Sequence, residues 1–172
     1  LIGLIILSVF ALYDKREAMM NDRQDKVRNI VEVGHAIVDY YGEQARLGHL
    51  PEGEAQRQAL AALSKVRYDN NEYFAVFDMR PYTLMHPIKA SIVGKDASII
   101  VDPDGNAVVL SMRDKVRQSG AGFVAYLWPK PNAKAPVPKL SYVKGYTPWG
   151  WIIMSGIYID DVDTAFWNDT VK

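Results

Sequence analysis

The sequence predicts an α+β domain in which a long N-terminal helix precedes one antiparallel five-stranded sheet. Residues 14–47 contain no proline and repeat apolar side chains every three or four positions, which is typical of a helix. Five runs rich in β-branched and aromatic residues follow between positions 73 and 158. The last three runs are joined by short links, so we expect them to pair as antiparallel neighbours.

The first 13 residues are almost entirely apolar. A stretch of about 12 residues is too short to span a bilayer, which takes about 20. No basic region precedes it, so it does not form a complete signal peptide. We expect residues 1–13 to be the end of a truncated transmembrane helix; the alternative is a buried or frayed apolar helix start.

The helix that follows carries one apolar stripe. At about 1.5 Å per residue it is roughly 50 Å long, which exceeds most globular helices. We expect its membrane-distal part to pack on the sheet, and its membrane-proximal part, with Met19, Met20 and Arg23, to face a second copy in a weak homodimer. The stripe contains Val27, Ile30, Val31, Gly34, Ile37, Val38, Tyr41 and Ala45.

The remaining elements follow from local signals. Gly48 and Pro51 end the first helix, and a proline suits the first turn of the next. The strand 123–128 leads into a connector, 129–138, whose prolines exclude a helix. Gly120 suits a helix C-cap. The other predicted elements are helices over 52–65, 107–119 and 159–171, strands over 73–78, 83–86, 139–146 and 151–158, and a loop over 88–98.

Composition and motifs narrow the function classes. Lys and Arg number 20, as do Asp and Glu, so no basic excess favours nucleic acid. There is no cysteine, no GxSxG and no HExxH, so we expect neither an enzyme nor a cofactor or metal site. Residues 102–106 resemble a calcium loop, but Arg113 stands where a bidentate Glu is required. The GxGxxA pattern at 120–125 precedes a strand, not the required helix.

Several runs together resemble a known family. They are WPKP…PVPKLSYVK, PWGW and GIYIDDVD, preceded in the same order by YFAVFD, LMHP and GKD, and they cover residues 67–163. The match is to the single Cache domains of bacterial methyl-accepting chemotaxis receptors. The resemblance implies a PAS-like fold, a periplasmic location and small organic acids as ligands. We place this domain at 14–163 and expect 164–172 to be the start of an outgoing helix toward a second membrane segment.

Strand alternation places candidate binding residues. Lys139, Ser141 and Val143 share one face of their strand. A lysine inside an apolar sheet needs an anionic partner if it is buried. A bound carboxylate would supply that partner, and so would a protein carboxylate such as Asp78 or Asp102.

Further candidates surround this lysine. Arg67 is a second cation, or else a surface ion-pair partner. His86 ends a strand beside a loop, where its imidazole donates to a carboxylate or holds the loop by a backbone hydrogen bond. Four residues form the expected apolar wall and polar rim, and Tyr142 completes the predicted site with a hydroxyl. The wall residues are Tyr73, Met85, Tyr126 and Trp128.

These observations predict the sensor domain of a chemoreceptor anchored in the inner membrane, with this domain in the periplasm. The expected ligand is a two- or three-carbon carboxylate of the acetate, propionate, pyruvate or lactate type. The same domain on a transmembrane histidine kinase is the main alternative. A membrane-anchored enzyme is disfavoured by the missing catalytic set, and a structural dimerisation module is supported only by the long helix.

Overall fold

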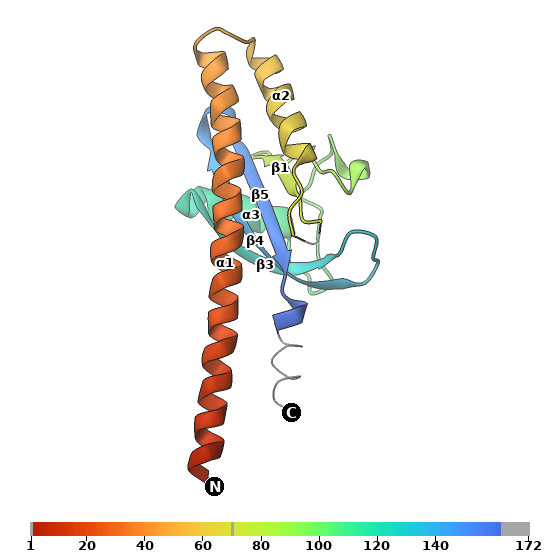
Figure 1. Ribbon diagram of the computed structural model, residues 1–172. Helices are drawn as coiled ribbons and strands as arrows, with labels where there is room; N and C mark the ends of the chain where they lie inside the picture. Colours follow the sequence, from red (N-terminus) through yellow and green to blue (C-terminus); the bar gives the residue numbers. More distant parts are fainter. Residues whose placement is uncertain (1, 70, 163–172) are drawn as a thin grey trace.

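The computed structural model describes residues 2–69 and 71–162 (Figure 1). Helix α1 (Ile2–Arg46) runs far past the sheet, and α2 (Glu52–Lys65) returns alongside its distal half. Both predicted helices are confirmed, and residues 2–13, expected as the end of a helix, continue into the rest of α1 without a break. Among the described residues, no helix combines the length and apolar character needed to cross a membrane.

One antiparallel sheet lies across the helices and has the order β2-β1-β5-β4-β3. Its central strand is buried along its whole length, which confirms a sheet covered on both faces. The predicted α+β class with five antiparallel strands is therefore correct. The strands are β1 (Phe74–Asp78), β2 (Thr83–Met85), β3 (Ala121–Pro129), β4 (Pro136–Tyr146) and β5 (Trp151–Tyr158).

Two apolar cores lie on opposite faces of this sheet. The first lies under α1 and α2, where Val31 and Val38 of the predicted stripe are fully buried against β1 and β5. The helix approaches closely at Gly34, where an added Cβ would lie 2.4 Å from Cε1 of Phe74. The second core lies under α3 (Val108–Ser119). Each face of the sheet thus buries alternate residues of the same strands.

Helix α3 ends as predicted at Gly120, whose φ of 74° is a left-handed conformation that glycine adopts at little cost. Between β2 and α3 the predicted loop contains one 3₁₀ turn, η1 (Ala90–Ile92). A second turn, η2 (Thr147–Trp149), joins β4 to β5. The loop and α3 together cover the second core.

The proline-rich connector is shorter than predicted. Strand β3 extends to Pro129 and β4 begins at Pro136, so the link comprises only residues 130–135. The first residues of β4 pair with β3 alone, since pairing with β5 starts at Lys139. A strand bonded on one side tolerates prolines, because their missing N–H groups have no partner to lose.

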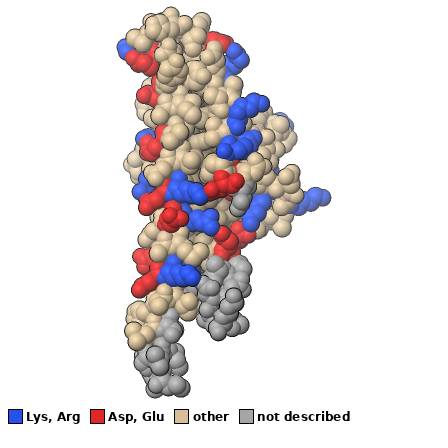
Figure 2. All heavy atoms as spheres, in the orientation of Figure 1, with Lys and Arg blue, Asp and Glu red and all other residues tan. Residues whose placement is uncertain are grey.

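Residues 160–162 are helical, at the start of the predicted outgoing helix. Residues 163–172, and with them the rest of that prediction, lie outside the described residues. On the face seen in Figure 2, Lys and Arg side chains lie next to Asp and Glu side chains.

Candidate functional site

A small cavity, here called the inner cavity, lies between the sheet and α3. It offers about 20 Å³ for the centres of water-sized molecules, room for one or two waters at about 10–15 Å³ each. Four side chains in its lining carry polar atoms: Tyr73, His86, Tyr126 and Trp128. The rest is apolar and comes from the sheet, the loop before α3 and α3 itself: Ala75, Phe77, Ile92, Ile100, Val108, Val109, Met112 and Met154. An apolar lining with few polar groups is typical of small-ligand sites.

His86 holds the loop, which is one of the two roles considered from the sequence. Its Nδ1 accepts hydrogen bonds from the backbone amides of Ile88 (3.3 Å) and Lys89 (3.0 Å), which hold the loop after β2. The hydrogen of a neutral ring must therefore sit on Nε2, which makes that atom a donor. Burial, helped by the charges of Lys139 and Lys89, lowers the pKa of His86 to about 3. The ring is thus a neutral donor at the cavity.

The remaining polar side chains of the lining contact one another or a residue of the sheet. The hydroxyl of Tyr126 lies 2.8 Å from Oγ of Ser141 in the buried sheet. The ring centroid of Tyr73 lies 5.1 Å from that of His86, which in turn lies 6.3 Å from that of Trp128. Burial, opposed by the hydrogen bond from Trp128, raises the pKa of Tyr73 to about 12. These groups are neutral hydrogen-bonding partners at physiological pH.

Lys139 lies behind Tyr73, with only 1% of its surface exposed. Its side chain passes over Gly156, where an added Cβ would lie 2.8 Å from Cε of the lysine. Nζ lies 4.4 Å from the ring centroid of Tyr73 and 4.6 Å from that of Tyr158, so both rings flank the ammonium group. Its hydrogen bond to the hydroxyl of Tyr158 is long, at 3.5 Å.

The protein carboxylate beside this lysine is Glu72, whose Oε2 lies 3.9 Å from Nζ. The predicted protein partners are wrong. Asp78 accepts hydrogen bonds from Arg80 and from the amide of Tyr82. Asp102 lies in a turn and accepts from the backbone amides of the turn and from Leu127 of β3. Both carboxylates are held by these other groups, and the ion pair of Lys139 is with Glu72.

Burial sets the protonation of the pair. It raises the pKa of Glu72 to about 7, opposed by the charge of Lys139. It lowers the pKa of Lys139 to about 8, opposed by the charge of Glu72. Burial therefore disfavours the charged form of each group, because an isolated buried charge is costly and each offers the other only partial compensation.

The structure brings six of the nine predicted site residues to this region and places three elsewhere. Arg67 is exposed and donates to the carbonyls of Ser64 and Val66. Met85 pairs with Val76 and packs in the core under α1 and α2, on the opposite face of the sheet. Tyr142 also faces α1, where its ring contacts Phe123. The residues brought together are Tyr73, His86, Tyr126, Trp128, Lys139 and Ser141.

Sequence reasoning missed three polar residues of the site. Glu72 was assigned to a polar turn, where charged side chains are normally solvated, and no signal marked its burial. The Nζ of Lys89 lies 4.0 Å from the ring centroid of Trp128. Because Lys89 lies in the loop directly after His86, the position of His86 beside the predicted site was a signal for this lysine as well. Tyr158 ends the last predicted strand, and its alternation with Met154 indicated the cavity face.

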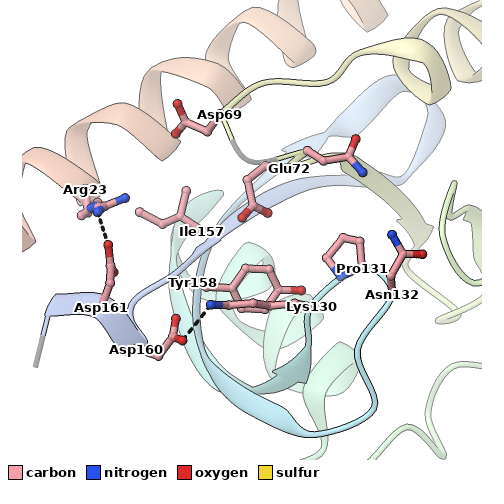
Figure 3. A pocket seen from close by; sticks show the side chains of 11 residues that line it. Arg23, Asp69, Glu72, Lys130, Pro131, Asn132, Ile157, Tyr158, Asp160 and Asp161 are labelled. Carbon is pink, nitrogen blue, oxygen red and sulfur yellow. Dashed lines mark hydrogen bonds and ion pairs between the residues drawn. The ribbon is translucent and has the colours of Figure 1, made fainter. Parts of the chain in front are cut away.

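Glu72 also borders a second hollow, here called the outer pocket, of about 310 Å³ (Figure 3). Tyr158 shares this boundary, so the two side chains separate Lys139 from the pocket. Two ion pairs cross the pocket rim, one between Arg23 of α1 and Asp161, the other between Lys130 and Asp160. The outer pocket thus lies where the incoming helix meets the outgoing segment.

Comparisons with known proteins show which family this chain belongs to. The profile described as "Single Cache domain 2" matches residues 19–171. The chain is 39% identical over 163 residues to the methyl-accepting chemotaxis protein McpP of Pseudomonas putida. It is 27% identical over 145 residues to the sensor histidine kinase MctS of Rhizobium johnstonii. These matches include 95% and 84% of this chain but only 30% of either relative, so the chain spans less than a third of their length.

Solved structures agree with the sequence matches. One, described as the periplasmic sensor domain of a chemotaxis protein, superimposes with a TM-score of 0.81 at 46% identity and covers 83% of this chain and 99% of that one. Another, from work on carboxylic acid recognition by a Cache chemosensory domain, gives a TM-score of 0.81 at 41% identity and covers 84% and 98%. Sequence and fold lead to one conclusion: the chain belongs to the Single Cache domain 2 family.

Proposed function

We propose that this chain is the periplasmic sensor domain of a membrane-anchored chemoreceptor and that it binds a carboxylate of two or three carbons. The observation that carries the proposal is the buried ammonium group of Lys139, whose contacts are a 3.5 Å hydrogen bond and a carboxylate at 3.9 Å. A buried cation is stabilised by a close anion, and a ligand carboxylate supplies one with charge-assisted hydrogen bonds.

The surrounding groups suit the rest of such a ligand. His86 offers a neutral Nε2–H donor, and the hydroxyl of Tyr126 lies on the same wall. The apolar part of the lining, including Met112 and Met154, would contact a short carbon chain. Support from relatives comes from the Cache domain whose solved structure was described in terms of carboxylic acid recognition.

Calorimetric titration with acetate, propionate, pyruvate and lactate tests the proposal. Replacing Lys139 with Met keeps the aliphatic stem and removes the charge. Loss of a charged hydrogen bond is worth about 1.5–3 kcal/mol, so we expect affinity to fall about tenfold to a hundredfold. Binding that is unchanged in Lys139→Met would remove this lysine from the site.

Lys144→Met is the matched control. It lies on the same strand but faces α1, where its Nζ pairs with Glu32. Because this ion pair is partly exposed, its loss should change stability by about 1 kcal/mol at most. Carboxylate affinity should stay within twofold of the unsubstituted protein.

A second candidate output is a histidine kinase, favoured by the similarity to MctS. The sensor chemistry is the same in both cases, so the two differ in what the sensor domain controls. Assay of the full-length parent separates them: autophosphorylation on histidine supports the kinase, and methylation of glutamates supports the chemoreceptor.

A further inference from the structure

We propose that Glu72 is the resident counterion of Lys139, and that an incoming carboxylate displaces it while Glu72 takes up one proton from solvent. The inference rests on the proposed carboxylate site and adds a residue that determines its affinity. Its physical content is an exchange of anions at one buried ammonium group. The exchange requires a protonated Lys139, and the ligand enters as an anion.

Glu72 and Lys139 lie close together but do not form a hydrogen bond. At 3.9 Å, Oε2 of Glu72 and Nζ of Lys139 are too far apart for a hydrogen bond. Among the described residues, Oε2 is one of two buried side-chain atoms that have no hydrogen-bond partner. Glu72 is only 5% exposed, so water does not compensate for the missing bond. A ligand able to reach Nζ more closely is therefore the better partner for the lysine.

Both carboxylates cannot remain charged beside one lysine. When two carboxylates share a buried site, their repulsion raises the pKa of one of them, namely the carboxylate whose pKa is already the higher. Glu72 is that group, because burial already raises its pKa to about 7. It also borders the outer pocket of about 310 Å³, from which a proton can reach it without crossing the inner cavity.

The other charges that face Glu72 have partners of their own. Asp69 from the preceding loop pairs with Lys26 of α1 at 2.7 Å. Lys130 from the end of β3 pairs with Asp160 at 2.7 Å. The first raises and the second lowers the pKa of Glu72, and both act less strongly than Lys139.

The neighbouring titratable rings do not supply a charge. Burial raises the pKa of Tyr158 on β5 and that of Tyr73 just before β1, so both stay neutral. His86 on the cavity wall is also neutral, because burial lowers its pKa. The exchange therefore involves Glu72, Lys139 and the ligand.

Infrared difference spectroscopy tests the exchange directly. Carboxyl-¹³C acetate is added to the protein at pH 7.5, so that ligand bands are shifted away from protein bands. We expect a new C=O stretching band of a protonated carboxyl group. It should be absent in Glu72→Gln and shifted in Glu72→Asp, whose shorter side chain changes the surroundings of the acid. Asp69→Asn removes a carboxylate from the same pocket and should keep the band.

Calorimetry supplies a second readout in the unsubstituted protein. Titration with acetate in two buffers of different protonation enthalpy should show net proton uptake at pH 7.5, and the infrared band distinguishes uptake by Glu72 from uptake by Lys139. Acetate affinity should fall between pH 7 and pH 8, by at most about tenfold per pH unit for one linked proton. Both calorimetric measurements use the unsubstituted protein, so they do not depend on whether a substituted protein folds.

The outcomes are distinguishable. Acetate binding that depends on Lys139, without proton uptake and without the infrared band, overturns the exchange and leaves the carboxylate site standing. A band that persists unchanged in Glu72→Gln assigns the proton to another group and also overturns it. If none of acetate, propionate, pyruvate and lactate binds, both proposals fall.

Discussion

At the scale of single residues, the site depends on a glycine. Gly156 leaves the space through which Lys139 crosses the sheet, since an added Cβ would lie 2.8 Å from Cε of the lysine and 2.2 Å from Oγ of Ser141. Gly156→Ala should cost about 1–3 kcal/mol of stability by overpacking, and it should weaken carboxylate binding. Urea unfolding and calorimetry measure the two effects.

Gly122→Ala is the matched strand control for that prediction. Its added Cβ would meet Cδ of Lys115 at 2.6 Å, in a flexible side chain that can move away. Stability and binding should both stay close to those of the unsubstituted protein. Equal losses in the two variants would mean that any alanine in this sheet is harmful and that Gly156 has no special role.

His86 should make stability depend on pH. In the unfolded chain a histidine titrates near about 6.5, whereas burial lowers the pKa of folded His86 to about 3. Between these values the unfolded state binds the extra proton. The contribution of His86 is therefore complete above pH 6.5 and decreases as pH falls toward 3, by up to about 1.4 kcal/mol per pH unit.

Urea unfolding between pH 7 and pH 5 measures this effect. The stability advantage of the unsubstituted protein over His86→Gln should shrink as the pH falls. His49→Gln is the matched control. This exposed histidine contacts Gln44 at the α1–α2 corner, away from the core. A constant difference between His86→Gln and the unsubstituted protein across this range would contradict a buried neutral His86.

At the scale of elements, α1 packs on the sheet through a close contact at Gly34. Alanine favours a helix over glycine by about 1 kcal/mol, but at this position its Cβ would lie 2.4 Å from Cε1 of the buried Phe74. We expect Gly34→Ala to lower the free energy of unfolding by about 1–3 kcal/mol, because overpacking outweighs helix propensity.

Gly53 in α2 tests the propensity alone. No other atom lies within 4 Å of the Cβ that an alanine would add there. Gly53→Ala should therefore stabilise the protein by about 0.5–1 kcal/mol. Opposite signs at the two helical positions, measured by urea unfolding, are the expected result; stabilisation by both would mean that α1 can shift away from β1.

The elements were largely predictable because their signals are local. The stripe of α1, the glycine after α3 and the alternation along β4 each depend on residues close in sequence, and each prediction is confirmed. The sequence could not predict which face of the sheet Met85 occupies. Strand β2 has only three residues, and the register of its pairing with β1 shifts beside Val76, so alternation along the strand gives little guidance. The partner of Lys139 was missed for a similar reason: Glu72 reaches it from a loop, where no periodicity fixes direction.

At the scale of the whole molecule, α1 leaves an apolar edge uncovered. Val33 and Tyr40, seven positions apart, are each 59% exposed, and Leu47, in the turn just after α1, is 49% exposed at the next position of the same spacing. A seven-residue repeat is the pattern by which helices pair. We predict a weak homodimer that forms along this edge, which lies nearer to the α1–α2 corner than the face expected from the sequence at Met19, Met20 and Arg23.

Sedimentation velocity over a range of concentrations measures the association. Tyr40→Glu should move the equilibrium toward monomer, because it places a charge in the predicted seam. Ala61→Glu adds the same charge to an exposed position of α2 and should leave the equilibrium unchanged. A protein that stays monomeric at every concentration would leave the exposed edge of α1 without this role.

The small inner cavity has a consequence for response time. If the proposed carboxylate binds in the inner cavity, which has space for one or two waters, the lining must move to admit it. Association that requires a conformational change is slower than diffusion allows. If opening comes first, the observed binding rate reaches a plateau as acid concentration rises, while occupancy still follows the dissociation constant. Such a sensor averages brief fluctuations in concentration and reports changes that outlast its opening time.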